Sequence, residues 1–352
     1  MSNPRIVWKN LPALSLQQDE RLLREWDRLN ATHGDLPFLG GDAIVSALKI
    51  LGDGRERLLI AYEGTTAHAM FILCARKEFK WQTFQPSQLP LGAWVADAHV
   101  PLQQLARSLV RGPLGFCLAL SITQVDPRIA PRGDDAPDSQ HADYINTGWI
   151  EIDGSFDAYW NARGKNLRQN MRKQRTKLQA DGVQLSLQVL RAHADMAPAI
   201  AQYGRLESAG WKAQKGTAIH PDNAQGRYYR ELLEHASLRG EAVVYQYLFD
   251  DRVVAINLCL ARKDTLIVLK TTYDESIQSY SPAFLLSESE LQELYRENHI
   301  KRLEYFGRLM EWHTKWTDQK RTLYHLTLYR WPLLKKLVQA RRSKANSTDH
   351  ST

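Results

Sequence analysis

The alternation of apolar and polar residues along the chain predicts a mixture of helices and short strands. Apolar residues at helical spacing predict helices over 19–30, 42–50, 102–110, 194–208, 222–239 and 282–298. Alternating or continuous short apolar runs predict strands over 58–62, 67–75, 79–84, 114–120, 145–152, 183–190, 242–249, 253–261, 265–272, 302–306 and 322–329. Many of the strands follow one another across tight turns, so the pattern favours an α+β fold with mostly antiparallel sheets.

A similar order of elements occurs twice. A helix, a hairpin and a third strand surround FILCARK at 71–77, and the same order surrounds NLCLARK at 257–263. Between them, residues 126–143 are rich in Pro, Asp and Gly and predict a flexible junction. We therefore expect one domain over 1–143, a second over 144–335, and a basic, disordered tail over 336–352. The stretch from Trp331 is expected to begin as a basic helix before it becomes disordered.

Composition limits the functional classes only a little. Hydrophobic residues make up 43% of the 352 residues and charged residues 24%, which is ordinary for a globular protein, and the formal net charge is +7. Cys74, Cys117 and Cys259 lie in apolar runs, which indicates free thiols, and no spacing of ligands predicts a metal site. Without a signal-peptide pattern or a long apolar run, we expect a cytoplasmic location.

The segment 156–182 is the most distinctive stretch. Its cations are Lys165, Arg168, Arg172, Lys173, Arg175 and Lys177, with no acid until Asp181. Leu167, Met171, Gln174 and Leu178 fall at helical spacing and predict one narrow buried stripe. A helix with so many uncompensated cations is either a solvated face or a site for phosphates on a coenzyme or on RNA.

Five short motifs, taken in order, resemble one known family. They are Asn-Leu-Arg with the downstream Arg, Leu and Gly over 166–182, Trp211-Lys212, Tyr273-Asp274, Ser281-Pro282 with Leu285-Leu286, and Phe306-Gly307-Arg308. Their order and spacing, over roughly residues 35 to 330, are similar to the FemAB-like branch of the GNAT acyltransferases, which includes CelD-type proteins. The resemblance implies two tandem GNAT-like domains, each a mixed, mostly antiparallel sheet flanked by helices, with the second domain carrying acyl transfer.

The resemblance also implies a set of site residues. Tyr273, Asp274 and Glu207 are the candidate catalytic residues, with Tyr273 and Asp274 beside the cleft and Glu207 as a possible base. The candidates for binding donor or acceptor are Arg168, Arg172, Trp211, Lys212, Tyr280, Ser281, Arg308 and Lys315. Ser281 stands at the cap of the helix 282–298, where it and the amides after Pro282 can meet a phosphate. Packing, capping and ordinary salt bridges are the competing explanations for these residues.

The sequence also departs from the family pattern. Ala283 replaces the usual Gly of the turn, Leu309 stands where Gly is common, and His313-Thr314 occupy the place of Tyr-Lys, with Lys315 as a displaced substitute. Three functions stay open. They are an N-acyltransferase that moves an acyl group from acyl-CoA to a small-molecule or glycan amine, a Fem-type aminoacyl transferase that uses charged tRNA, and a degenerate GNAT pair that only binds. Residues 165–177 contain no aromatics for RNA stacking and no coiled-coil insertion is present, so acyl-CoA is favoured, with cell-envelope or polysaccharide biosynthesis as the setting.

Overall fold

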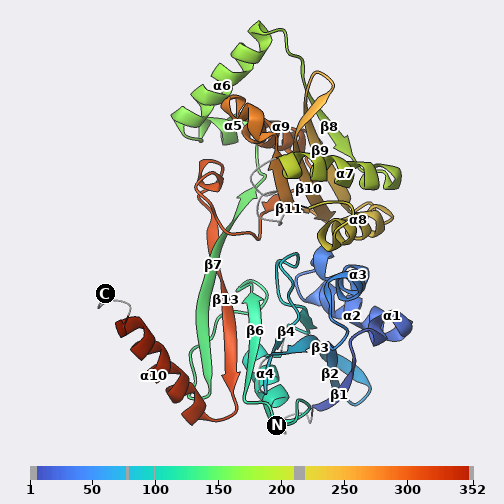
Figure 1. The fold of residues 1–352 in the computed structure, drawn as a ribbon, viewed down its shortest axis with the longest axis vertical. Helices are drawn as coiled ribbons and strands as arrows, with labels where there is room; N and C mark the ends of the chain where they lie inside the picture. The colour runs from blue at the N-terminus through green and yellow to red at the C-terminus, as the bar shows by residue number, and fades with distance from the viewer. Residues whose placement is uncertain (1–5, 77–78, 99, 210–218, 349–352) are drawn as a thin grey trace. The chain divides into compact units, whose positions relative to one another are not determined.

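The protein, described here by a computed structural model, divides into two compact units. Unit 1 comprises 1–145 and 322–352, and unit 2 comprises 146–321 (Figure 1). The structure describes residues 6–76, 79–98, 100–209 and 219–348, with the side chains of 342–348 left aside. The sequence predicted a division at 143 and kept 322–335 with the second domain. The observed division differs because the strand Lys320–Tyr329 pairs with Ala119–Val125 of unit 1.

Unit 1 is built on a mixed sheet. Its strands, in spatial order, are β1 (Val7–Pro12), β2 (Arg57–Glu63), β3 (Thr66–Ala75), β4 (Lys80–Thr83), β6 (Ala119–Val125), β13 (Lys320–Tyr329) and the first part of β7 (Ser139–Glu151), while β5 (Trp94–Ala96) pairs with β3. The pair β4 and β6 is parallel. The pairs β1–β2, β2–β3, β3–β4, β3–β5 and β6–β13 are antiparallel.

The helices of unit 1 are α1 (Ser15–Gln18), α2 (Glu20–Thr32), the short 3-10 turn η1 (Pro37–Leu39), α3 (Gly41–Leu51), α4 (Leu102–Arg111) and α10 (Pro332–Thr348). They include α2 and α4, which contact strands of this sheet. In α4, Leu102, Leu105 and Leu109 are buried at helical spacing and share a core with Phe71 and Leu120 of the sheet. The predicted helix 102–110 is therefore confirmed, and its apolar stripe is what holds it on the sheet.

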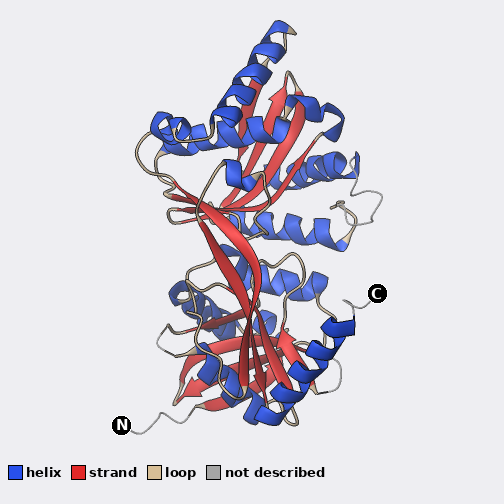
Figure 2. Cartoon of the chain, turned by 90° about the vertical axis from the view of Figure 1, so that its left-hand side faces the viewer, coloured by secondary structure: helices blue, strands red, loops and turns tan. Residues whose placement is uncertain are grey.

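Unit 2 repeats this plan. Its strands, in spatial order, are the second part of β7, β12 (Arg302–Glu304), β11 (Thr265–Tyr273), β10 (Arg252–Arg262), β9 (Ala242–Phe249) and β8 (Leu185–Leu190). Only β11 and β12 run parallel among these pairs, and the others are antiparallel. The helices are α5 (Phe156–Asn161), α6 (Lys165–Ala180), α7 (His193–Ala209), α8 (Ala224–Ser237), η3 (Glu275–Tyr280), α9 (Pro282–Glu297) and η4 (His313–Lys315) (Figure 2).

The internal repeat seen in the sequence has a structural counterpart. Residues 71–75 lie in β3 and residues 257–262 lie in β10, and each strand is the second arm of a hairpin. Each unit also has one parallel pair among its otherwise antiparallel neighbours, β4 with β6 and β11 with β12. The predicted α+β class, with a mixed and mostly antiparallel sheet flanked by helices in each unit, is confirmed.

Three local predictions differ from the structure. The strand predicted over 114–120 begins only at Ala119, because Gly115 takes a positive φ of 62° and turns the chain first. The junction 126–143 ends early, since β7 starts at Ser139 with mostly polar residues that give no apolar signal, although Ser139 and His141 are buried. The tail 336–348 is helical in α10, where the Lys335 Nζ donates hydrogen bonds to the carbonyls of Ala136 and Ser139 at 2.9 and 2.6 Å.

Candidate active site

The parallel strands β11 and β12 part after three residue pairs. Thr265, Leu266 and Ile267 pair with the three residues of β12, and β12 then ends at Glu304. On its other side β11 stays paired with β10 as far as Tyr273. No residue of β12 pairs with the stretch 268–273, so one edge of β11 is open there. An open strand edge offers backbone N–H and C=O groups to a ligand.

A pocket of about 380 Å³ lies at this opening. Its lining residues are Thr271 and Tyr273 at the end of β11, Gln278 in η3, Ser281, Pro282, Ala283, Phe284 and Ser287 around the start of α9, and Trp312. A strand end, a helix start and an aromatic wall thus meet around one space. This is an arrangement in which α/β proteins commonly hold a ligand.

The start of α9 is open to an anion. Ser281 has the left-handed backbone angles φ 56° and ψ 49°, and its side chain makes no capping hydrogen bond to the helix. The N–H groups of Phe284 and Leu285 instead donate to the Ser281 carbonyl at 3.0 and 3.1 Å. Ser281 therefore occupies the predicted cap position, but its hydroxyl does not cap. An uncapped helix start attracts negative charge through its N–H groups and dipole.

Trp312, which forms the aromatic wall, is held in place by His313. The two rings stack with centroids 3.5 Å apart, and Tyr305 packs against His313 at 4.6 Å. The N–H of Met310 donates to Nδ1 of His313 at 2.9 Å, and burial lowers the pKa of His313 to about 4. The imidazole is therefore neutral at physiological pH. It serves as a rigid support rather than as a cation.

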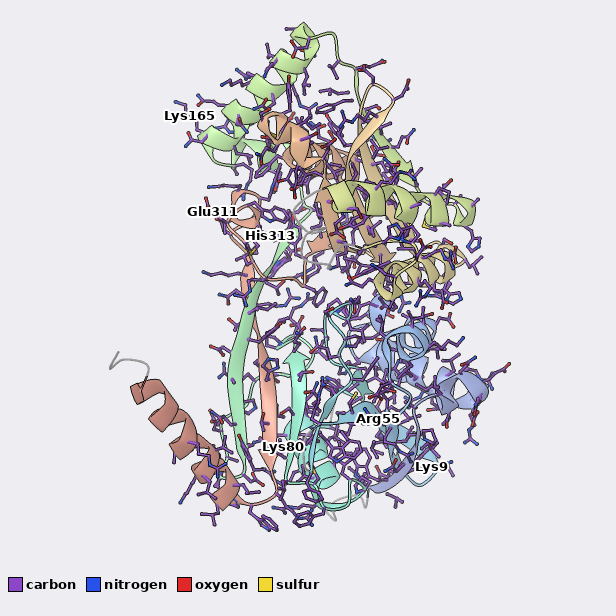
Figure 3. The ribbon with its side chains drawn as sticks, in the orientation of Figure 1. Lys9, Arg55, Lys80, Lys165, Glu311 and His313 are labelled. Atoms are coloured by element: carbon purple, nitrogen blue, oxygen red, sulfur yellow. The ribbon has the colours of Figure 1, made fainter. Side chains whose placement is uncertain are left out.

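A second hollow, of about 620 Å³, is lined largely by residues of the basic helix α6. Figure 3 labels Lys165, at the start of this helix. We call this hollow the basic groove, and its lining residues are Trp160, Asn161, Lys165, Arg168, Gln169, Arg172, Arg175, Thr176, Gln179 and Glu288. Leu167, Met171, Gln174 and Leu178 are the buried residues of α6, which confirms the predicted stripe. The cations therefore cover the remaining faces, and four of them line one groove.

The charge of the basic groove is only partly compensated. Arg175 pairs with Glu288, with its Nη2 3.0 Å from Oε2. Arg168 donates from Nε to the carbonyl of Arg163 at 3.2 Å, which orients the side chain without neutralising it. Among the described residues, neither Arg168 nor Arg172 has an acidic partner within ion-pair distance. The groove thus keeps an excess of positive charge.

The pocket and the basic groove open on consecutive residues of α9. Ser287 lines the pocket, and Glu288 lines the groove. The two hollows therefore share α9 as part of their lining. A third hollow, of about 480 Å³, lies at the start of α6 and includes Lys165 and Lys315 among its lining residues.

The structure separates the predicted site residues into groups. Tyr273 and Ser281 line the pocket, whereas Arg168 and Arg172 line the basic groove. Burial, followed by the charge of Glu275, raises the pKa of Tyr273, so its phenol stays protonated at neutral pH.

Asp274 is occupied by local contacts. Its Oδ1 accepts hydrogen bonds from the N–H and Oγ of Ser276 at 2.9 and 2.6 Å, and Arg252 forms an ion pair with it. Burial alone would raise the pKa of Asp274, but the bonds from Ser276 and Arg252 outweigh it and leave the pKa lowered. A carboxylate with a lowered pKa is a weak base. The contacts of Asp274 are those of a residue that caps η3.

Tyr280 and Glu207 also have other contacts. The Lys177 Nζ lies 4.3 Å from the centroid of the Tyr280 ring, which links η3 to α6. Glu207 is buried on α7, where its Oε2 accepts from the N–H of Ile219 at 2.6 Å and its Oε1 from the Tyr203 hydroxyl at 3.4 Å. Among the described residues that line the pocket, none comes from α7.

The remaining candidates lie apart from the pocket lining. Arg308 is exposed on the loop after β12. Lys315 pairs with Glu311, with Nζ 3.2 Å from Oε1, and Glu311 lies with His313 on the same loop in Figure 3. Trp211 and Lys212 lie outside the described residues.

The sequence missed the apolar part of the pocket. Phe284 and Trp312 form its aromatic surface, and Gln278 and Ser287 complete it. A usable signal exists for Phe284 and Ser287, since helical spacing puts 283, 284 and 287 on neighbouring faces of the first turns of α9. Nothing in the local sequence around Trp312 distinguishes a pocket wall from a core indole.

The described part of the chain offers neither a cluster of metal ligands nor a membrane-spanning helix. Among its residues, no group of three or more His, Cys, Asp or Glu is arranged to hold a metal ion. None of the helices that the structure describes is both long and apolar enough to span a membrane.

Fold and site together define a class. Both units have a mixed, mostly antiparallel sheet flanked by helices, and in unit 2 two parallel strands part beside a pocket that adjoins an uncapped helix start.

Comparison with known proteins agrees with this class. Residues 165–314 match the family model of the acetyltransferase (GNAT) domain. The structure is similar to the C-terminal domain of a protein from Agrobacterium fabrum assigned as a lysylphosphatidylglycerol synthetase, with TM-score 0.55, 12% identity, and coverage of 90% of this chain and 95% of that one. It is also similar to FemX, with TM-score 0.55, 11% identity, and coverage of 89% and 97%. Among curated proteins, none matches the sequence significantly.

The match to the GNAT domain lies within unit 2, and the chain as a whole shares its fold with FemX, a structural neighbour of the FemAB-like branch.

Proposed function

We propose that the protein is an N-acyltransferase that takes an acyl group from acyl-CoA and transfers it to an amine of a small molecule or glycan. The observation that carries this proposal is the open edge of β11 over 268–273, beside the pocket that Tyr273, Phe284 and Trp312 line. A thioester placed there meets backbone N–H groups, an apolar wall and an uncapped helix start together.

The reaction needs few side chains. The amine nitrogen attacks the thioester carbonyl carbon, a C–N bond forms, the C–S bond breaks, and coenzyme A leaves as a thiolate. Backbone N–H groups at the open edge of β11 can stabilise the carbonyl oxygen as it gains negative charge. The amine proton passes to solvent or to a nearby base, and the thiolate takes up a proton.

We assign Tyr273 to the protonation of the departing thiolate. Its phenol lines the pocket, and its raised pKa keeps it protonated, so it can donate to the departing thiolate. Asp274, the neighbouring catalytic candidate from the sequence, has a different part in this proposal. It holds the start of η3 in place through its ion pair with Arg252 and its hydrogen bond from Ser276. Tyr273 is thus the candidate catalytic residue, and Asp274 is a positioning residue.

The phosphates of the donor fit two neighbouring places. The pyrophosphate meets the start of α9 near Ser281, and the cations Arg168 and Arg172 receive the remaining phosphate in the basic groove. The step from Ser287 to Glu288 along α9 joins the two places. A donor bound only through its acyl group would not need the groove.

Aminoacyl transfer from charged tRNA is the second candidate, and one observation favours it. Trp160, which also stacks with Phe156 and Trp316, lines the basic groove together with the cations, and aromatic residues among cations are typical of surfaces that bind RNA. The sequence of α6 alone gave no such aromatic residue. The size of the groove, about 620 Å³, also exceeds that of the pocket.

A thermal-shift series with acetyl-CoA, longer acyl-CoAs and charged tRNA separates the candidates, because a ligand that binds only the folded state raises the melting temperature. We expect stabilisation by acyl-CoA and release of free thiol when amine acceptors are added. Stabilisation by charged tRNA alone would favour the second candidate. A lack of response to every donor would leave a binding protein without transferase activity.

A further inference from the structure

Three aromatic side chains of unit 1 form an exposed row. Phe79, Phe116 and Trp331 are 56%, 54% and 46% exposed. The rings of Phe79 and Phe116 lie 5.1 Å apart, and those of Phe116 and Trp331 lie 6.1 Å apart. Scattered single apolar residues on a surface are ordinary, but contiguous exposed aromatics indicate an interaction site.

The apolar surface continues along α10, which follows Trp331 directly (Figure 1). Leu333 and Leu337 are 64% and 52% exposed and lie four residues apart, on one face of the helix. The other face rests on unit 1, where Lys335 is held by the carbonyls of Ala136 and Ser139. The two exposed leucines therefore point away from the contacts that fix the helix.

The apolar surface is surrounded by positive charge. The guanidinium of Arg330 lies over the rings of Phe116 and Trp331, at 5.6 and 5.7 Å from their centroids. The sequence from 330 to 348 contains six cations, Arg330, Lys335, Lys336, Arg341, Arg342 and Lys344, and no acid. Exposed aromatic and leucine side chains with cations among them are the pattern of a helix that lies in a membrane interface.

We propose that this surface, made of Phe79, Phe116, Trp331, Leu333 and Leu337 with the cations of α10, docks unit 1 on an anionic phospholipid bilayer. Leucine side chains offer no stacking surface to nucleic-acid bases, whereas they enter the acyl boundary of a bilayer together with Trp and Phe. A second copy of the chain would bring cations against cations. Anionic headgroups complement the charge, and the apolar row complements the layer beneath them.

Sedimentation with lipid vesicles tests this proposal on the full chain. We expect binding to vesicles of phosphatidylcholine mixed with phosphatidylglycerol, and much weaker binding to phosphatidylcholine alone. Leu333→Ser with Leu337→Ser should reduce binding to the anionic vesicles at least about tenfold, and Lys336→Glu with Arg341→Glu should do the same. All four side chains are exposed, so these variants should keep the wild-type melting temperature.

Matched controls come from exposed positions elsewhere. Leu238→Ser removes an exposed leucine of unit 2, and Lys9→Glu with Lys49→Glu reverses two exposed cations of unit 1; neither should change vesicle binding. Equal loss in the controls would overturn the proposal, and so would absence of binding to anionic vesicles. If the α10 variants instead lose binding to RNA, or lose self-association in analytical ultracentrifugation, while vesicle binding is unchanged, the surface serves that other partner and the proposal is wrong.

Discussion

Arg175 and Glu288 form the ion pair that joins the basic helix α6 to the helix α9. The Nη2 and Nε atoms of Arg175 donate to Oε2 of Glu288 at 3.0 and 3.2 Å. Burial raises the pKa of Glu288, although Arg175 opposes the shift. Both residues line the basic groove. The pair therefore holds α6, with its cations, in position against α9.

The first prediction concerns this pair. Arg175→Ala leaves Glu288 buried without its cation, and we expect the free energy of unfolding to fall by about 1–3 kcal/mol. Replacing both residues by Met should recover most of the loss, because no buried charge is then unpaired. Arg24→Ala is the control, since Arg24 and Glu20 form an exposed ion pair, and such pairs contribute little to the free energy of unfolding. An Arg175→Ala protein as stable as wild type would contradict the role of the pair.

The second prediction concerns Arg168 and Arg172 of the basic groove. Arg168→Glu with Arg172→Glu should weaken binding of the phosphorylated donor at least about tenfold, because hydrogen bonds to charged groups contribute about 1.5–3 kcal/mol each. Arg172 is exposed, and Arg168 is half-buried with a hydrogen bond to the carbonyl of Arg163, so the melting temperature should change little. Titration calorimetry gives the dissociation constant, and Lys9→Glu with Lys49→Glu provides an equal change of net charge. An unchanged dissociation constant would remove the groove from the donor site.

The third prediction concerns Tyr273. If its phenol protonates the leaving thiolate, Tyr273→Phe should lower kcat by about 10²–10⁴-fold and leave the dissociation constant of the donor nearly unchanged. Thiol release at saturating donor measures kcat, and Tyr144→Phe, at an exposed tyrosine of unit 1, is the control. Normal turnover by Tyr273→Phe would show that the phenol only packs against the pocket.

The fourth prediction concerns pH and Glu290. This carboxyl is buried on α9, where Asn257 Nδ2 donates to its Oε2 at 2.6 Å, and burial raises its pKa from 4.5 to about 7 despite that bond. The folded protein then holds a proton that the unfolded chain releases above pH 4.5, so the contribution of Glu290 to stability is greatest below that pH and falls as pH rises through about 7. The integrated loss is about 3 kcal/mol.

Glu290→Gln should remove this dependence. We expect the melting temperature of the variant, relative to wild type, to be higher at pH 8 than at pH 5, because the amide never ionises. Glu20→Gln, at an exposed position, should show no such difference. A constant offset between wild type and Glu290→Gln across this range would mean that Glu290 does not titrate in the folded protein.

Much of the fold could be predicted from local pattern. The stripe Leu167, Met171, Gln174 and Leu178 gave α6 and its buried face correctly, because a helix on a core needs that spacing. The polar start of β7 could not be predicted, since its strand partners rather than its own residues keep it extended. The basic helix expected after Trp331 is α10, but its continuation to Thr348 was not predicted.

The site was predictable in its polar part only. Tyr273 and Ser281 follow from the strand end and helix start that flank them in sequence. Trp312 could not be foreseen as a pocket wall, because its position depends on where β12 ends and on the stacking of His313. Glu207 was named as a base on the family resemblance alone, and its carboxylate accepts hydrogen bonds from Ile219 and Tyr203.

Hydrogen exchange of backbone amides, measured with and without acetyl-CoA, tests the central claim most directly. We expect the donor to slow exchange over 268–273 at the open edge of β11 and at the start of α9, with smaller effects along α6. Saturating acetyl-CoA that leaves exchange over 268–287 unchanged, or protects only residues outside unit 2, would contradict the assignment of this pocket as the site of acyl transfer.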